Sequence, residues 1–260
     1  MAATPDKNAN RLALVTGGAG GIGSATCHAL AKAGMHVAVA DINLARAQAT
    51  AAKLPGEGHA AHALDVLREE SVAAVFAQAE AAQGPITVLV CVAGGSLITD
   101  DYRPRIADMT LDFWSRTEAV NARGTFLCVR EFLRLREKQP LPDGRIIALA
   151  SLAGQTGGSS QTDAAYGASK AAIMSLMRNA AVQGAPLGIT ANAIAPGLID
   201  TDKVRMAVTA AQREATAAQT PLKRLGEASE VAQVIAFLAS PGSSFVTGQT
   251  VNVNGGRFMN

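Results

Sequence analysis

The chain has few aromatic residues, little charge and no long apolar run, and each shortage excludes a class of protein. Aromatic residues make up 4% of the 260 residues and charged residues 17%. The net charge is only +2 and no block of lysine or arginine occurs, so the sequence lacks the electrostatic footprint of a protein that binds nucleic acid or an anionic membrane. No apolar run approaches about 18 residues, so we expect no membrane span.

Cysteine is equally scarce. Cys27, Cys91 and Cys128 stand apart in apolar stretches, with no C-x-x-C spacing. This pattern indicates reduced, buried thiols rather than disulfides or a metal site. Residues 1–11 are polar and lack the apolar core of a signal peptide, so we expect a cytoplasmic protein.

Short β-branched runs alternate with longer alanine-rich stretches along most of the chain. Such alternation predicts an α/β fold: a doubly wound, parallel, seven-stranded sheet of the Rossmann type, in three layers and a single domain spanning residues 1–260. The predicted strands are 12–16, 36–41, 58–64, 87–92, 145–151, 189–194 and 250–253. The predicted helices are 21–33, 44–53, 69–83, 111–121, 125–138, 166–183 and 229–239.

Two stretches break this rhythm, at about 95–110 and 198–221, and we expect one mobile helix near 204–218 in the second. Both follow the carboxyl ends of predicted strands, where open α/β sheets bind their ligands. We therefore expect them to form the substrate walls. Arg103 and Arg105 in the first stretch either meet an anionic substrate or, as we favour, are ordinary surface arginines.

A glycine-rich turn follows the first predicted strand. Gly17, Gly21 and Gly23 stand in a G-x-x-x-G-x-G pattern, with Ile22 inside it, and the turn opens a helix. Glycine lets backbone N–H groups approach a pyrophosphate closely, and the helix N-terminus adds positive potential. The sequence thus predicts a dinucleotide-binding turn rather than a bare strand–helix connection.

Asp41 ends the second predicted strand and predicts the choice of cofactor. A carboxylate there accepts hydrogen bonds from the ribose hydroxyls of NAD and repels the 2′-phosphate of NADP by about 4 kcal/mol at a separation of about 4 Å. Ile42, which adds no cation, follows it. NAD is therefore the predicted cofactor and NADP is disfavoured. The alternative is that Asp41 caps the next helix, a task that Asn43 is placed to perform instead.

Asp65 and Val66 follow the third predicted strand. They are placed to flank the adenine, with the carboxylate accepting from its amino group. The competing interpretation is a helix N-cap before Arg68.

Tyr166 and Lys170 lie four residues apart on a predicted helix, so they share one face. Alcohol oxidation needs a base for the hydroxyl proton, and ketone reduction needs an acid. The pKa of a free phenol is about 10, and a neighbouring ammonium together with a cationic nicotinamide would lower it. Ser151 precedes this helix and would hold the substrate oxygen as an uncharged donor.

These segments resemble the short-chain dehydrogenase/reductase family over about residues 11–256. The matching motifs are TGGAGGIG, Asp41, Asp65-Val66, Ala93-Gly94, Asn121 in AVNARG, SLAG at Ser151, YGASK, NAIAPG and the ending LASPGSSFVTGQTVNVNGG. The resemblance implies that Tyr166 is the acid/base, that Lys170 tunes it and binds the nicotinamide ribose, and that Asn121 holds a proton-relay water. It also implies contacts from Pro196, Gly197, Ile199 and Thr201 to the nicotinamide end.

The chain departs from the family pattern at two points. Where the family has Asn-Asn-Ala-Gly, this sequence has Cys91-Val92-Ala93-Gly94, so the side chains that brace that strand are missing, and Ala148 stands where many relatives have asparagine. The four catalytic positions are unaffected. His59 and His62 lack a third ligand nearby, so no metal site is predicted.

The leading functional hypothesis is an NAD-dependent oxidoreductase that interconverts a secondary alcohol and a ketone. Reduction of 3-oxoacyl groups on acyl carrier protein is the nearest rival, since the ending TVNVNGGRFM resembles that branch, although Asp41 opposes its usual NADPH. A dinucleotide sensor without turnover is the rival from another class. The resemblance further implies a homo-oligomer, a tetramer before a dimer, joined through helices 125–138 and 166–183.

Overall fold

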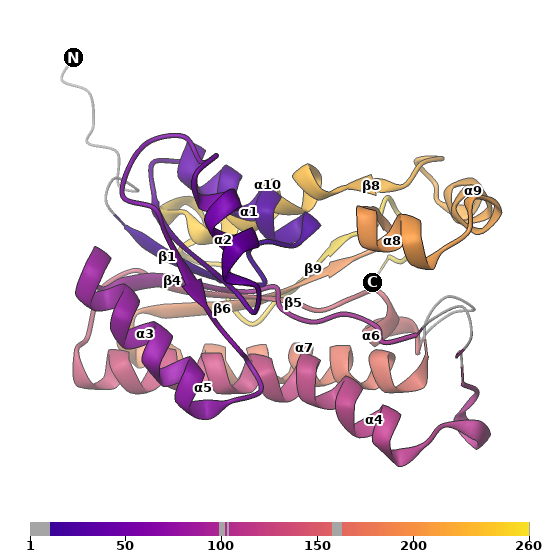
Figure 1. Cartoon of the computed structure of the whole chain (residues 1–260), viewed down its shortest axis with the longest axis horizontal. Coiled ribbons are helices and arrows are strands. Elements are labelled where there is room, and N and C mark those ends of the chain that lie inside the picture. Colours follow the sequence, from indigo (N-terminus) through magenta and orange to yellow (C-terminus); the bar gives the residue numbers. More distant parts are fainter. Residues whose placement is uncertain (1–10, 99–101, 103, 158–162, 260) are drawn as a thin grey trace.

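Seven parallel strands form the central sheet, in the order β3-β2-β1-β4-β5-β6-β9 (Figure 1). The computed structural model describes residues 11–98, 102, 104–157 and 163–259. The order reverses direction between β1 and β4, and such a reversal marks the ligand-binding edge of a doubly wound sheet. The strands are β1 (Leu12–Thr16), β2 (His36–Asp41), β3 (Ala60–Ala63), β4 (Ile86–Cys91), β5 (Gly144–Leu149), β6 (Ile189–Pro196) and β9 (Thr250–Val253).

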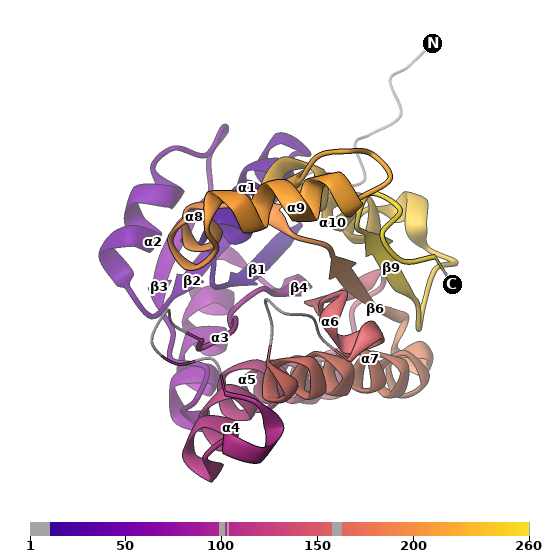
Figure 2. The same ribbon diagram turned by 90° about the vertical axis from the view of Figure 1, so that its right-hand side faces the viewer.

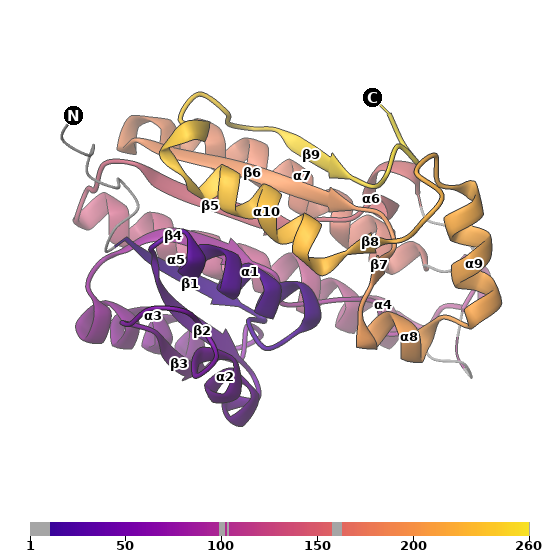
Figure 3. The same ribbon diagram turned by 90° about the horizontal axis from the view of Figure 1, so that it is seen from above.

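Helices cover both faces of the sheet, because its strands carry apolar side chains on both sides. Leu14 and Val15 are neighbours in β1 and belong to two different cores, one on each face. One face is covered by α1 (Gly21–Lys32), α2 (Leu44–Ala51) and α10 (Ala228–Ala239), and the other by α3 (Glu69–Gln83), α5 (Gly124–Lys138) and α7 (Ala164–Gly184) (Figures 1 and 3).

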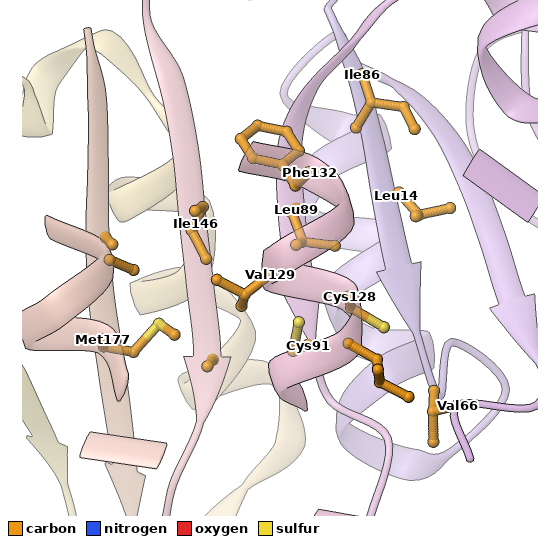
Figure 4. Close-up of a cluster of buried hydrophobic side chains, with 14 of the residues drawn as sticks. Leu14, Val66, Ile86, Leu89, Cys91, Cys128, Val129, Phe132, Ile146 and Met177 are labelled. Atoms are coloured by element: carbon orange, nitrogen blue, oxygen red, sulfur yellow. The ribbon is translucent and has the colours of Figure 1, made fainter. Parts of the chain in front are cut away.

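The core beneath α5 shows how closely helix and sheet pack. Val129 and Phe132 on α5 lie over Leu89 and Ile146 of the sheet (Figure 4), and all four side chains are at most 2% exposed. The predicted three-layer, single-domain α/β fold is confirmed. None of the helices in the described parts of the chain is long and apolar enough to cross a bilayer.

The strand boundaries differ from the prediction mainly at β3. The predicted strand began at Gly58, but that residue has φ +77°, a left-handed conformation that does not continue a strand. The strand therefore starts at Ala60.

The stretch 198–221 contains more structure than the single predicted helix. It holds α8 (Asp202–Ala207) and α9 (Ala210–Gln219), separated at Val208. A new helix starts because Thr209 and Gln212 form a capping box, in which each side chain bonds the backbone of the other. Two short paired strands, β7 (Ile199–Asp200) and β8 (Gly226–Glu227), tie the base of this segment together.

The break that we predicted between helices 111–121 and 125–138 is also wrong. A π-helical turn, Ala119–Arg123, joins α4 (Leu111–Glu118) directly to α5. The Gly124 amide bonds the Ala119 carbonyl, five residues back. Gly124 itself permits a close approach to Val66, because a Cβ there would lie 2.8 Å from the Val66 Cγ2.

Candidate active site

The residues predicted to hold the cofactor and to react collect at the carboxyl edge of the sheet, the edge that faces the viewer in Figure 2. They come from the segments that follow β1 to β6. The helices α8 and α9 lie on one side of this edge, and α4, α6 (Ala153–Thr156) and the start of α7 lie on the other (Figure 2). The chain thus brings segments far apart in sequence to one place.

The glycine turn packs directly against the loop after β4. Gly17 has φ +67°, and a Cβ at this position would lie 2.8 Å from the backbone of Ala93. The N-cap of α1, Gly20, has no side chain to satisfy the first-turn amides of the helix. The turn therefore presents N–H groups and the positive end of a helix, which fits the pyrophosphate of a dinucleotide.

The N-terminus of α8 reaches the same turn. A Cβ at Gly21 would lie 2.8 Å from the Thr201 Cγ2, so only glycine fits opposite this threonine. Thr201 caps α8 by accepting a hydrogen bond from the Val204 amide. Pro196 ends β6, and Gly197 and Ile199 lead from it to the threonine. The segment predicted to contact the nicotinamide end therefore lies beside the predicted pyrophosphate turn.

Asp41 is held at the mouth of the turn by two backbone amides. Its Oδ2 accepts from the Ala19 N–H and its Oδ1 from the Asn43 N–H, both at 3.1 Å. Asn43, not Asp41, caps α2 by accepting from the Arg46 amide, so the alternative role for Asp41 is wrong. Ile42 points to solvent, with 74% of its surface exposed.

Arg46 is a neighbour of this turn that sequence reasoning missed. Its Nη2 donates to the Ala19 carbonyl at 2.9 Å, on the residue whose N–H bonds Asp41. The signal was its place three residues after the Asn43 cap, which puts it in the first turn of α2. A cation therefore stands close to the carboxylate that we expect to select the cofactor.

Asp65 and Val66 follow β3 as predicted, and neither caps α3. Asp65 accepts a hydrogen bond from the Leu67 amide at 2.9 Å, and Arg68 occupies the N-cap position. The competing N-cap interpretation of Asp65 is therefore wrong.

Tyr166 and Lys170 lie together on the first turns of α7. The Lys170 ammonium is 5.7 Å from the centre of the Tyr166 ring, and it donates to the Leu149 carbonyl at 2.6 Å. Lys170 is only 2% exposed, and no described carboxylate pairs with it. Burial and the nearby Lys203 lower the pKa of Lys170 to about 7, so the lysine titrates near neutrality.

We predicted that the pKa of Tyr166 would be lowered, but in the protein without a cofactor it is raised. Burial raises the pKa of Tyr166 and the Asp163 carboxylate raises it further, while a hydrogen bond with Ser151 lowers it. Desolvation of the phenolate outweighs the other influences, so the phenol keeps its proton at neutral pH. The influence of Ser151 on this pKa means that the two side chains lie close together.

Asp163 is a second residue that the sequence analysis missed. Its Oδ1 caps α7 by accepting the Tyr166 amide at 2.8 Å, and its Oδ2 accepts from the Ser96 hydroxyl at 3.1 Å. It is 5% exposed. Asp163 therefore joins the loop after β4 to the helix that carries Tyr166. An aspartate three residues before the tyrosine was the available signal.

Asn121 lies in the π-helical turn and holds the loop after β4 with both ends of its amide. Its Oδ1 accepts from the Gly95 amide at 2.8 Å, and its Nδ2 donates to the carbonyls of Gly95 and Thr117. Gly94 packs against it, since a Cβ there would overlap the Asn121 oxygen. The side chain therefore shapes the wall opposite the glycine turn.

The remaining candidates lie apart from this centre. Arg105 forms an exposed ion pair with Asp108 at 2.7 Å, as the surface interpretation predicted, and Arg103 lies outside the described residues. His59 accepts a hydrogen bond from the Val37 amide, and His62 contacts Gln83 at 3.4 Å. The two rings therefore bond different residues and do not act as a pair. Among the described residues, no group of three or more potential metal ligands occurs.

Known proteins share this architecture over nearly the whole chain. Residues 17–257 match a family described as enoyl-(acyl carrier protein) reductase. The chain is 38% identical to cis-4-hydroxycyclohexanecarboxylate dehydrogenase of Sinomonas cyclohexanicum, with 95% of this chain and 96% of that protein covered. It is also 38% identical to the 3-oxoacyl-acyl-carrier-protein reductase of Pseudomonas aeruginosa, with 96% and 98% covered.

Solved structures agree. A short-chain type dehydrogenase/reductase from Mycobacterium marinum superposes with a TM-score of 0.90 at 31% identity, over 98% of both chains. A short-chain dehydrogenase/reductase from Brucella melitensis superposes with a TM-score of 0.87 at 35% identity, over 97% of this chain and 98% of that one. The chain belongs to the short-chain dehydrogenase/reductase family of oxidoreductases.

Proposed function

We propose that the protein interconverts a secondary alcohol and a ketone, with NAD(H) as the hydride carrier. The observation that carries this proposal is the approach of Ser151, Tyr166 and Lys170 at the edge of the sheet that also holds the glycine turn. Ser151 is close enough to lower the pKa of the tyrosine, and the lysine ammonium lies 5.7 Å from the tyrosine ring. Related oxidoreductases that act on hydroxyl-bearing carbon support the same reaction class.

In this proposal each side chain moves or positions one proton. A bound nicotinamide would supply or accept the hydride. Tyr166 donates its proton to the alkoxide oxygen during ketone reduction and withdraws it during alcohol oxidation. Ser151 donates a hydrogen bond to the same oxygen as its charge develops. Lys170, with a pKa of about 7, exchanges its own proton near neutral pH and favours the phenolate when it is charged.

Asn121 fits the proton relay through its backbone rather than its side chain. Both ends of its amide are engaged by Gly95 and Thr117. The backbone carbonyl accepts from the Thr125 hydroxyl at 2.7 Å and, within the π-helical turn, from the Gly124 amide. We propose that the water implied by the family joins these two donors at this carbonyl.

We infer a preference for NAD over NADP from the fixed Asp41 carboxylate. Two backbone amides hold it at the mouth of the turn, where a 2′-phosphate would meet a like charge. Asp65 and Val66 would flank the adenine. Gly17, Gly21, Ile22 and Gly23 would hold the pyrophosphate. Ala93, Gly94, Pro196, Gly197, Ile199 and Thr201 would line the nicotinamide end.

The second candidate is reduction of 3-oxoacyl groups on acyl carrier protein, which the Pseudomonas aeruginosa relative favours. The acidic Asp41 weighs against the NADPH that such reductases usually take. The end of α7, Val182-Gln183-Gly184, also lacks the arginine expected of a surface that receives an acidic carrier. A strong preference for NADPH with acetoacetyl thioesters would favour this candidate instead.

Absorbance at 340 nm separates these hypotheses. The purified protein is mixed with NADH or NADPH and a panel of ketones, and with NAD or NADP and the matching secondary alcohols. We expect turnover with NAD(H) and a weaker rate with NADP(H). A protein that binds NADH and never consumes it across the panel would be a dinucleotide sensor, and the proposed function would fail.

We further propose a cytoplasmic homotetramer that packs through α5 and α7. The reduced, buried cysteines and the alanine-rich surface of α7 support these two assignments. Sedimentation velocity measures the assembly state directly.

A further inference from the structure

Lys203 is a cation at the carboxyl edge that none of the roles above uses. It lies in the first turn of α8, two residues after Thr201. The residue as a whole is exposed, yet its ammonium reaches across to the loop after β4. A methyl side chain at Gly95 would overlap the Lys203 Nζ, so the two are in close contact.

The acidic residues beside Lys203 are already paired with another cation. Arg205 binds both carboxylate oxygens of Asp200, at 2.9 and 3.0 Å, and also contacts Asp202 at 3.3 Å. Residues two apart on a helix do not face each other, so Arg205 points away from Lys203, and its pairs with these acids leave Lys203 out. Within the described part of the chain, no carboxylate or carbonyl oxygen accepts a hydrogen bond from the Lys203 ammonium.

Lys203 also acts on the reacting centre. Protein around its ammonium lowers the pKa of Lys203, although burial is only partial. The same ammonium is the second-largest cause of the lowered pKa of Lys170. Lys170 and Lys203 are therefore close together, and neither has an acidic partner. Their combined positive potential attracts an anion.

A short chain of contacts leads from Lys203 to Tyr166. The ammonium lies against Gly95, the next residue is Ser96, and the Ser96 hydroxyl bonds Asp163. The other oxygen of Asp163 accepts the Tyr166 amide. Asp163 bonds the Ser96 hydroxyl and the Tyr166 amide, and it forms no ion pair with Lys203.

We propose that Lys203 binds a carboxylate carried by the substrate, so that the protein acts on hydroxy acids and the matching oxo acids. This inference rests on the proposed function and names its substrate class. The reacting carbon would lie at Ser151 and Tyr166, and the carboxylate would extend from it toward Gly95 and Lys203.

The cofactor phosphates are the other anions near this edge, and the geometry favours the substrate. The first-turn amides of α1, which lack a side-chain cap, already provide a site for a pyrophosphate. The Lys203 ammonium lies against Gly95, on the path to Asp163 and Tyr166. Its charge therefore falls on the substrate side of the nicotinamide end.

The test compares acids with their esters in the wild-type protein and in Lys203→Met and Lys203→Arg. The substrate pairs are 3-hydroxybutyrate and cis-4-hydroxycyclohexanecarboxylate, each with its methyl ester. Cyclohexanecarboxylate and cyclohexanecarboxamide, which have no hydroxyl to oxidise, are titrated by calorimetry into the protein with bound NAD. Lys138→Met, on the exposed end of α5, is the matched control. The dissociation constant of NAD is measured for every variant.

We expect at least one acid to be preferred over its ester by about tenfold in kcat/KM, equivalent to about 1.4 kcal/mol. Lys203→Met should abolish that preference and weaken cyclohexanecarboxylate binding by a similar factor, while Lys203→Arg keeps most of both. Equal use of acid and ester, or carboxylate binding unchanged in Lys203→Met, would overturn the inference. A matching loss of NAD affinity would assign Lys203 to the cofactor instead and overturn it as well. If no pair is turned over, the proposed function fails, and the calorimetric result still decides the role of Lys203.

Discussion

The two edges of the sheet differ in whether a buried cation has an acidic partner. At the amino edge, Arg136 is 1% exposed and is paired with Glu80, whose carboxylate also accepts the amide of Ile86 at the start of β4. At the carboxyl edge, Lys170 is 2% exposed and its ammonium bonds only the Leu149 carbonyl among the described residues. One cation is neutralised locally and the other is not.

The paired arginine serves stability, whereas the unpaired lysine serves function. A buried charge without a counter-charge costs free energy, so a fold selected for stability alone would pair it or replace it. The carboxyl edge instead collects Lys170, Lys203 and the uncapped turn at Gly20, and all three favour an anionic or phenolate partner. Lysines without an acidic partner therefore mark the reacting edge of this molecule. The following variants test it.

The largest expected effect is at Tyr166. Tyr166→Phe removes the proton donor and keeps the ring, so kcat should fall by about a thousandfold or more. The affinity for NADH, measured by fluorescence titration, should stay nearly unchanged. Residual activity close to wild type would show that another group transfers the proton.

The next effect is on stability, at the amino edge. Glu80→Gln leaves the Arg136 guanidinium buried without a counter-charge, and we expect the free energy of unfolding to fall by about 3 kcal/mol. Urea denaturation measures this change. Glu70→Gln, exposed on the same helix, is the control and should change stability by less than about 0.5 kcal/mol. The comparison between the edges breaks down if Lys203→Met is as destabilising as Glu80→Gln.

Asp41→Ala should shift the choice of cofactor. We expect the NAD/NADP ratio of kcat/KM to fall about a hundredfold, because screening reduces a repulsion of about 4 kcal/mol. Arg46 would then favour the 2′-phosphate, so Asp41→Ala with Arg46→Ala should recover less NADP activity than Asp41→Ala alone. Asp112→Ala, on exposed α4, controls for the loss of a negative charge. An unaltered ratio would rule out the repulsion argument.

The smallest effect, counted per pH unit, is a pH dependence of stability at Lys170. The pKa of Lys170 is about 7 in the folded protein, against about 10.4 in an unfolded chain. Between these values the unfolded state binds the proton and the folded state does not, so stability rises with pH. Relative to Lys170→Met, the wild type should gain at most about 1.4 kcal/mol per pH unit between about pH 7 and about pH 10.4, and nothing outside this window. A difference independent of pH across this range would show that Lys170 keeps its proton in the fold.

The sequence predicted the parts of the molecule that depend on local pattern. Strands buried on both faces read as apolar runs, and glycines at a strand–helix turn have a steric reason to be there, so the sheet and the turn at Gly17–Gly23 were predictable. The approach of Tyr166, Lys170 and Ser151 was predictable because the first two share a helix face and the third follows β5, whose last carbonyl Lys170 bonds.

What the sequence did not reveal depends on contacts between distant segments. The position of the Lys203 ammonium against Gly95 depends on how α8 packs beside the loop after β4, which no local pattern specifies. The raised pKa of Tyr166 comes chiefly from burial, which no spacing rule measures. The boundary between α8 and α9 follows from a capping box that competed with a continuous helical pattern.

The π-helical turn at Ala119–Arg123 has a consequence for how the molecule tolerates insertions and deletions. An extra residue in one turn changes the angular phase of everything downstream by about 100°. Deleting one residue here would restore a regular α-helix, yet it would rotate Phe132 away from the sheet or pull Asn121 off Gly95, because both cannot be kept. The packing of α5 therefore requires this turn to keep its length. We expect the irregular segment to tolerate insertions and deletions less well than the regular helix beside it.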